Sequence, residues 1–190
     1  MIEFFGLPGS GKSYLVERNK KDVQFTEVKV TKSERFYYGL IFCILHPIIS
    51  SCFIGLILGD KDVKTFSLRK HLIMYIYMTR AAKYQKSKNI KKALIDEGLL
   101  MMFISITNIP SFLEDFLLRS SVFTNHKIFI IEASDEIRYL RMKKRGRYPR
   151  SGFFSNKNQK ENLRSIEKNY KERSKKLIKL LPDCELICNN

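Results

Sequence analysis

The chain has 190 residues, of which 35 are Lys or Arg and 19 are Asp or Glu, so its formal net charge is +16. A hydrophobic share of 44% excludes a disordered chain, and the length suits one domain with its own core. The positive charge favours anionic ligands, namely nucleotides, nucleic acid or an acidic membrane surface. A general lysine bias that keeps the protein soluble explains the charge equally well, because the lysines are spread along the chain.

Cysteine and histidine usage argues against a zinc centre. The four cysteines, at positions 43, 52, 184 and 188, form no C-x-x-C pair, and the three histidines do not cluster with them. We interpret the cysteines as small buried apolar residues in a reducing compartment. Because the chain opens directly with a strand-like run, we expect no cleavable signal peptide. We expect a cytoplasmic protein, peripheral to the inner face of the membrane if residues 36–59 contact lipid.

Residues 6–13 read GLPGSGKS and match the phosphate-binding pattern G-x-x-x-x-G-K-[ST] at every fixed position. Residues 1–5 before the motif predict a buried strand, and residues 13–20 after it predict a helix. In this arrangement the loop N–H groups and the positive end of the helix dipole converge on phosphate oxygens. Lys12 would reach the β- and γ-phosphates of ATP, and the Ser13 hydroxyl would ligate Mg²⁺. We assign nucleotide binding to Gly6, Pro8, Gly9, Ser10, Gly11, Lys12 and Ser13.

The segment from Phe36 to Gly59 holds no Asp, Glu, Lys or Arg. It is long enough to span a membrane, and basic residues flank both of its ends. A single crossing is disfavoured, because it would separate the phosphate loop from the acidic and arginine residues further along, and because both flanks are positive. Two interpretations remain: short helices broken near His46-Pro47 and buried in a subdomain or homodimer interface, or a hairpin that dips into one leaflet.

The remaining pattern alternates between strands and helices. We expect strands at 23–30, 93–96, 127–131 and 185–188, and helices at 64–86, at 99–106, from Pro110, from Asp135 after a Ser134 cap, and at 159–181. The stripe on helix 64–86 that should face the core consists of Leu68, Leu72, Tyr75, Ile76 and Thr79. The alternation predicts an α/β fold, a parallel β-sheet flanked by helices, with a mostly helical apolar insertion.

Two acids are expected to meet the phosphate loop at the carboxyl edge of the sheet, where open α/β sheets bind ligands. Asp96 and Glu97 end the predicted strand at 93–96. A carboxylate in this place orients the waters of Mg²⁺ or accepts the proton of an attacking hydroxyl. Either acid could serve as the base. Asp96 and Ser13 are the candidate metal ligands.

A cluster of arginines follows the helix that begins after Ser134. Arg138, Arg141 and Arg145 lie three and four residues apart, so they share one helical face. Arg145 and Arg147 flank a glycine and are placed to fold over the phosphates, where they would neutralise charge on the transferring group. The predicted catalytic residues are Lys12, Asp96, Glu97, Arg145 and Arg147.

The sequence resembles the small nucleoside- and nucleotide-kinase branch of the P-loop proteins, in particular the thymidylate-kinase-like enzymes. The segments IEFFGLPGSGKS, ALIDEG and IEASDEIRYLRMKKRGR carry the likeness, which covers about half of the chain. The resemblance implies an arginine-rich lid at 144–156 that contains Arg145 and Arg147. It also implies that Arg141 contacts the nucleotide or its phosphates, and that Asp96 or Glu97 serves Mg²⁺ or the acceptor.

Two departures from this family concern the acceptor. Thymidylate kinases carry Asp-Arg after the central strand, where this chain has Asp96, Glu97 and Gly98. Residues 33–90 do not resemble the acceptor-binding region of a nucleotide kinase, and we interpret them as a helical acceptor subdomain within a single kinase-like domain, 1–190. The GLPGSGKS start also resembles small kinase-like proteins of bacterial surface-polysaccharide gene sets.

These observations favour an ATP- and Mg²⁺-dependent phosphotransferase that moves the γ-phosphoryl group to a hydroxyl of a nucleotide, a sugar or a glycolipid precursor. Its partners would be a nucleoside triphosphate and that small acceptor, with contact to a membrane surface or a homodimer through 36–59. A polynucleotide 5′-kinase is an alternative that the +16 charge suits, although nucleic acid is not the partner we expect. A further alternative is a nucleotide-gated membrane or assembly module without phosphotransfer.

Overall fold

Five parallel strands form one sheet in the order β2-β3-β1-β4-β5. The strands are β1 (Ile2–Gly6), β2 (Thr26–Glu27), β3 (Ala93–Ile95), β4 (Lys127–Glu132) and β5 (Cys184–Cys188). The structure is a computed structural model that describes residues 1–23, 25–59, 68–106, 109–144, 156–181 and 183–189. The parallel order places β1, which leads into the phosphate loop, between β3 and β4 at the centre of the sheet.

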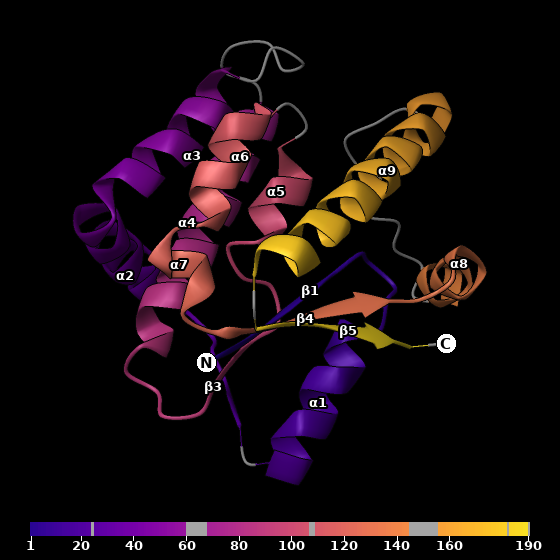
Figure 1. Cartoon of the computed structure of the whole chain (residues 1–190), viewed down its shortest axis with the longest axis horizontal. Helices are drawn as coiled ribbons and strands as arrows, with labels where there is room; N and C mark the ends of the chain where they lie inside the picture. The colour runs from indigo at the N-terminus through magenta and orange to yellow at the C-terminus, as the bar shows by residue number, and fades with distance from the viewer. Residues whose placement is uncertain (24, 60–67, 107–108, 145–155, 182, 190) are drawn as a thin grey trace.

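Helices cover both faces of this sheet (Figure 1). They are α1 (Lys12–Val23), α2 (Lys32–Leu45), α3 (Pro47–Gly59), α4 (Leu68–Ser87), α5 (Met101–Ser105), α6 (Ser111–Leu118), α7 (Ser121–Thr124), α8 (Asp135–Lys144) and α9 (Asn156–Leu180). In the view of Figure 1, α1 lies below the sheet, α5 and α9 lie above it, and α2 and α3 form the left flank. The predicted α/β fold, a parallel sheet flanked by helices, is confirmed.

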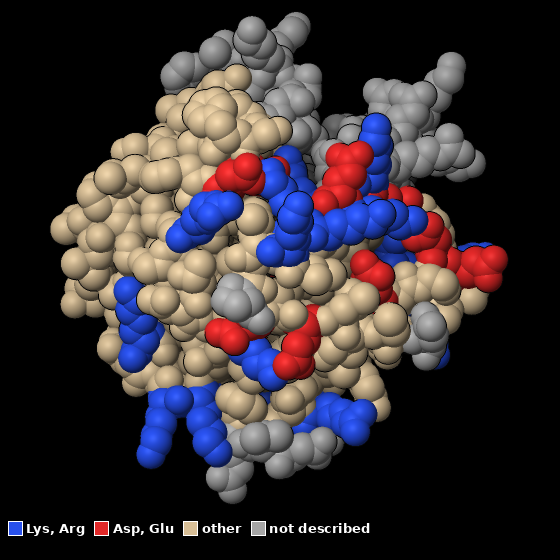
Figure 2. All heavy atoms as spheres, viewed as in Figure 1, with Lys and Arg blue, Asp and Glu red and all other residues tan. Residues whose placement is uncertain are grey.

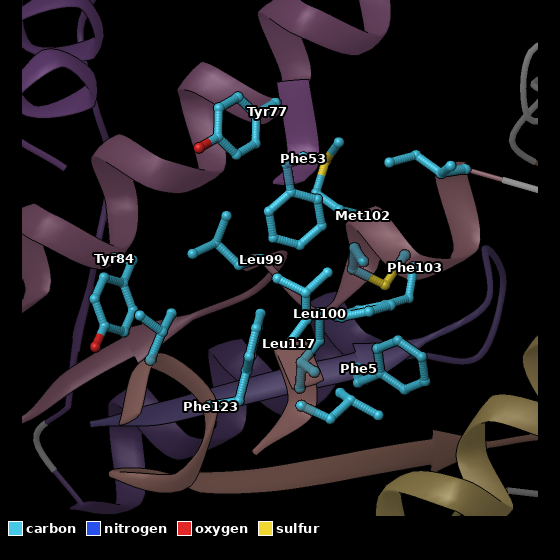
Figure 3. Packing of buried hydrophobic residues seen from close by; sticks show 14 of the residues in the cluster. Phe5, Phe53, Tyr77, Tyr84, Leu99, Leu100, Met102, Phe103, Leu117 and Phe123 are labelled. Carbon is cyan, nitrogen blue, oxygen red and sulfur yellow. The ribbon is translucent and has the colours of Figure 1, made fainter. Parts of the chain in front are cut away.

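The central strand separates two cores because consecutive side chains of a strand point to opposite faces. Phe4 packs with Val16 of α1 and with Leu94 and Ile131 of the neighbouring strands. Phe5 faces the other way, into a larger cluster formed with residues of α2 to α7 and α9 (Figure 3). Both phenylalanines are fully buried, so β1 and the start of the phosphate loop are held from both sides.

The larger core draws the apolar segment 36–59 into the domain. Phe53 of α3 packs against Tyr77 of α4, with ring centroids 5.5 Å apart, and against Phe103 of α5, at 5.7 Å (Figure 3). Phe42 of α2 is fully buried and meets the ring of Tyr84 edge-on. The inner face of this segment is therefore part of the protein core.

The segment is broken where the sequence indicates. α2 ends at Leu45, His46 is its C-cap, and Pro47 is the first residue of α3, a position where the N–H that proline lacks is not needed. The two helices are bent by 112° at this break. Within the described residues no single helix is long and apolar enough to cross a membrane, whereas α2 and α3 pass that test only as a bent pair.

Two local expectations differ from the structure. The strand expected at 23–30 is only Thr26–Glu27, because α1 continues to Val23 and the strand pairs with β3 alone. The stripe expected on α4 is also wrong, since Tyr75 is half exposed while Tyr77 is fully buried. α4 packs against α2, α3 and β3, so a different set of its residues faces inward: Ile73, Tyr77, Arg80, Ala81 and Tyr84.

Candidate active site

The phosphate loop joins β1 to α1 and has a shape that requires glycine. Gly9 and Gly11 adopt positive φ angles of 83° and 95°, which side-chain-bearing residues rarely adopt. A Cβ atom on Gly9 would also lie only 2.8 Å from the carbonyl oxygen of Arg138. Ser13 is exposed in the first turn of α1, where the helix dipole favours anions.

Lys12 is folded against its own loop. Its Nζ donates hydrogen bonds to the carbonyl oxygens of Gly6, at 2.5 Å, and Leu7, at 3.2 Å. Burial lowers the pKa of the Lys12 ammonium from 10.5 to about 8, while the charges of Glu97 and Arg80 act on it in opposite directions. Lys12 is therefore within electrostatic reach of charged residues that follow β3 and that lie on α4.

The arginines of α8 and the residue after β5 hold the back of the loop. Arg141 Nη1 lies 3.4 Å from the carbonyl oxygens of Gly9, Ser10 and Asn189. Asn189 Nδ2 donates to the same Ser10 oxygen at 2.8 Å. The structure thus brings Arg141 to the phosphate loop, while its contact with a nucleotide stays a prediction. It adds Asn189, which the sequence does not distinguish from any other polar residue near a strand end.

Arg138 links the loop to α9. Its guanidinium donates from Nε to the carbonyl oxygen of Pro8 at 3.3 Å, from Nη1 to Asp135 Oδ1 at 2.8 Å, and from Nη2 to Glu167 Oε1 at 3.3 Å. Only 2% of the residue is exposed. Two carboxylates therefore compensate a buried guanidinium, which suits a structural brace behind the loop.

Asp96 and Glu97 follow β3, and the structure gives them different surroundings. Asp96 Oδ1 accepts hydrogen bonds from Lys83 Nζ at 2.5 Å and from the N–H of Glu97 at 2.8 Å. Burial raises the pKa of Asp96, but Lys83 and the Glu97 N–H outweigh it and hold the pKa below its usual range. The Glu97 side chain is half exposed, with Oε2 3.7 Å from Arg80 Nη2.

Sequence analysis missed the two cations that face these acids. Arg80 and Lys83 lie three residues apart on α4 and reach Glu97 and Asp96 respectively. The Arg80 side chain is only 8% exposed, and its Nη1 lies 3.2 Å from the sulfur of Met102. The sequence signal was weak, because α4 also carries Arg69, Lys70 and Lys86, and nothing in its pattern distinguishes Arg80 and Lys83 from them.

A buried acid fixes the turn that carries Asp96 and Glu97. Glu3 of β1 is 1% exposed, and its Oε1 accepts the N–H of Leu100 at 3.0 Å. Its Oε2 pairs with His126 Nε2 at 3.2 Å. A Cβ atom on Gly98 would overlap the carboxylate of Glu3, so glycine allows the turn to approach β1. A glutamate inside an otherwise apolar strand was the unused sequence signal.

Some predicted residues lie beyond what the structure describes. Arg145, Arg147 and all but the ends of the lid at 144–156 lie outside the described residues. Within the described residues, no group of three or more His, Cys, Asp or Glu could hold a metal ion by itself. A Mg²⁺ ion bound chiefly by phosphate oxygens needs only one or two protein ligands, so Ser13 and Asp96 stay our predicted magnesium ligands.

A cavity of about 420 Å³ adjoins the site without containing Lys12 or the two acids. It lies between α9 and the ends of β4 and β5, and Leu7 and Arg138 are among its lining residues. The charged residues on the Asp96 side, and not this cavity, therefore define the candidate active site.

Comparison with known proteins identifies the fold. No protein-family model matches the chain, and no curated protein matches its sequence. Solved structures of deoxyadenosine kinase from M. mycoides do match. The complex with dATP has a TM-score of 0.56 at 19% identity, over 98% of this chain and 90% of that one. The complex with dCMP and a flexible dCDP gives 0.56 at 19% identity, over 100% and 89%.

A third structure, the same kinase with dCTP, has a TM-score of 0.53 at 20% identity, over 98% of this chain and 89% of that one. The chain therefore has the P-loop fold of these nucleoside kinases, which confirms the predicted fold class. The comparisons do not bear on the resemblance to proteins of polysaccharide gene sets.

Proposed function

We propose that the protein transfers the γ-phosphoryl group of ATP to a hydroxyl of a small, nucleoside-like acceptor. One observation carries this proposal: Lys12 of the phosphate loop lies within electrostatic reach of an acid and cation cluster formed by α4 and the turn after β3. Phosphoryl transfer needs a phosphate cradle on one side and an acid with neutralising cations on the other. The likeness to deoxyadenosine kinases supports a nucleoside as the acceptor.

On the donor side, the loop N–H groups and the α1 N-terminus bind the β- and γ-phosphates, and Lys12 adds its charge. Arg141 and Asn189, which contact carbonyl oxygens of the loop, are our candidates for contacts to the rest of the nucleotide. Ser13 and Asp96 would hold Mg²⁺, which supplies charge neutralisation between the phosphates. Arg145 and Arg147 remain our predicted lid residues.

On the acceptor side, Glu97 is the better base. Lys83 holds Asp96 in its ionised form and lowers its affinity for a proton, whereas Glu97 is half exposed and open to an acceptor. The acceptor oxygen forms a bond to the γ-phosphorus as the bond to the β–γ bridging oxygen breaks. Glu97 takes the hydroxyl proton, ADP leaves, and Arg80 offsets charge on the transferred group.

The proposal is tested with γ-labelled ATP and a panel of deoxyribonucleosides, ribonucleosides, nucleoside monophosphates and sugars. We expect label to pass to the 5′-hydroxyl of one or more nucleosides, with ADP as coproduct. If label passes only to a sugar, the protein is still a phosphotransferase, but its acceptor is a sugar and not a nucleoside. Tight ATP binding without transfer to any acceptor of the panel would overturn the proposal and favour the nucleotide-gated module.

A further inference from the structure

The elbow formed by α2 and α3 carries an apolar face that points away from the core. Phe36, Leu40 and Ile44 of α2 lie at intervals of four residues, which places their side chains on one face of that helix, and their exposed fractions are 71%, 48% and 67%. Ile48, in the first turn of α3 beyond the bend, is also 64% exposed. Figure 2 shows this flank as a broad surface at the left without charged atoms over α2 and α3.

The outer face is not needed to build the domain. The opposite face of the same helices, with Phe42, Ile49 and Phe53, is already buried in the core. A helix that is apolar all round normally has both faces covered. Large contiguous apolar surfaces on a folded protein mark contacts with another protein or with a membrane. The exposed face of the elbow therefore fits a partner.

Basic residues border this face, and the acids nearby are neutralised. Lys32, in the first turn of α2, is exposed, and Lys88 Nζ lies at the bend, 3.3 Å from His46 Nε2. Between residues 28 and 59 the sequence has one acid, Glu34, and it is paired with Lys86 at 2.6 Å. The border of the elbow is thus positive, which complements an anionic partner.

We propose that the α2–α3 elbow docks on the surface of an anionic lipid bilayer. Its exposed side chains would enter the boundary between headgroups and acyl chains, and its basic border would face the lipid phosphates. A second copy of the chain complements the elbow less well, because a two-fold contact would bring two basic borders together. This docking does not depend on phosphoryl transfer, so it can be tested separately from the proposed function.

The chain has no tryptophan, so a single introduced one reports on its own position. Ile44→Trp places the probe on the elbow, and Leu140→Trp places it on α8, at a residue that is also 67% exposed. With vesicles that contain phosphatidylglycerol we expect a blue shift and quenching by brominated lipid for Ile44→Trp only. Phosphatidylcholine vesicles should give a smaller shift. Unchanged Ile44→Trp emission with the anionic vesicles would overturn the proposal.

A charge at the same place should weaken docking. We expect Ile44→Glu to weaken cosedimentation of the full chain with anionic vesicles about tenfold or more, since a carboxylate replaces an apolar side chain that docking would bury in lipid, and Leu140→Glu to leave it unchanged. Far-UV circular dichroism and ATP binding check that both variants fold. If the protein is instead a dimer without lipid, fails to bind vesicles, and Ile44→Glu makes it monomeric, the elbow is an interface between copies and the lipid proposal is wrong.

Discussion

The two sides of the candidate active site are built in opposite ways. The phosphate loop comes from eight consecutive residues, 6–13, and depends on backbone shape at Gly9 and Gly11. The acceptor side takes Arg80 and Lys83 from α4 and its acids from the turn after β3, and it exists only because these elements pack together. Phosphate binding is thus a local property of the chain, whereas the acid and cation cluster is a property of the fold.

The largest expected effect lies where the two sides meet, at Lys12. We expect Lys12→Ala to lower kcat/KM about 10³-fold, as is usual when a group that stabilises transition-state charge is lost. The fold should survive, because the substitution removes a buried charge whose pKa is already lowered. Steady-state kinetics measure the loss, and Lys20→Ala on the same helix is the control. Activity within tenfold of the wild type would contradict this role of Lys12.

Arg80 tests whether the acceptor side acts separately from the donor side. We expect Arg80→Gln to lower kcat about 10²-fold and to change the Kd for ATP much less, because Arg80 pairs with Glu97 and contacts Met102, whereas it acts on Lys12 through its charge. Arg80→Lys should restore part of the rate, since it keeps the charge. A Kd for ATP that rises as much as kcat falls would show that Arg80 serves the donor instead.

Gly98 tests the support beneath the acids. Gly98→Ala should lower the free energy of unfolding by about 1–3 kcal/mol, because its Cβ would overlap the carboxylate of Glu3, which Leu100 and His126 hold in place. Gly55→Ala on α3 is the matched control, since a Cβ there meets nothing within 4 Å. That control should be neutral or stabilising in urea titrations. If both variants unfold at the same urea concentration, the turn at Gly98 does not pack closely against Glu3.

The smallest expected effect is the uptake of a fraction of a proton when ATP binds. With a pKa of about 8, Lys12 is about half protonated at pH 8, and bound phosphates would favour its charged form. ATP binding should therefore take up about half a proton at pH 8 and almost none at pH 6, and its affinity should fall as the pH rises above 8. Calorimetry in two buffers of different ionisation enthalpy measures the uptake, which Lys12→Arg should abolish.

The same difference between local and assembled features decided what the sequence could predict. The phosphate loop and the break at His46-Pro47 were predictable because glycine, lysine and proline restrict the chain within a few residues. The loose alternation of apolar and polar residues at 23–30 predicted too long a strand, because α1 continues to Val23 and only the two-residue strand β2 joins the sheet. Periodicity alone could not say which side of α4 faces inward, since that depends on its neighbours in space.

The candidate site follows the same rule. Asp96 and Glu97 were identified from their place after a strand, but their unequal surroundings depend on Lys83 and Arg80, more than ten residues away in sequence. Glu3 is separated by 97 residues from Leu100, whose N–H it accepts. No pattern within a short window contains such pairs. The roles of the site residues accordingly stay predictions, of which the variants above address those of Lys12 and Arg80.

The hydrogen bonds of Lys12 to Gly6 and Leu7 have a consequence for selectivity. Any anion that recruits this ammonium must compete with two carbonyl oxygens of the same loop. Under the proposed function, a lone phosphate or sulfate would offer few contacts in exchange, whereas a triphosphate would fill the loop and the helix N-terminus at once. The loop would then favour nucleoside triphosphates over simple anions such as phosphate and sulfate.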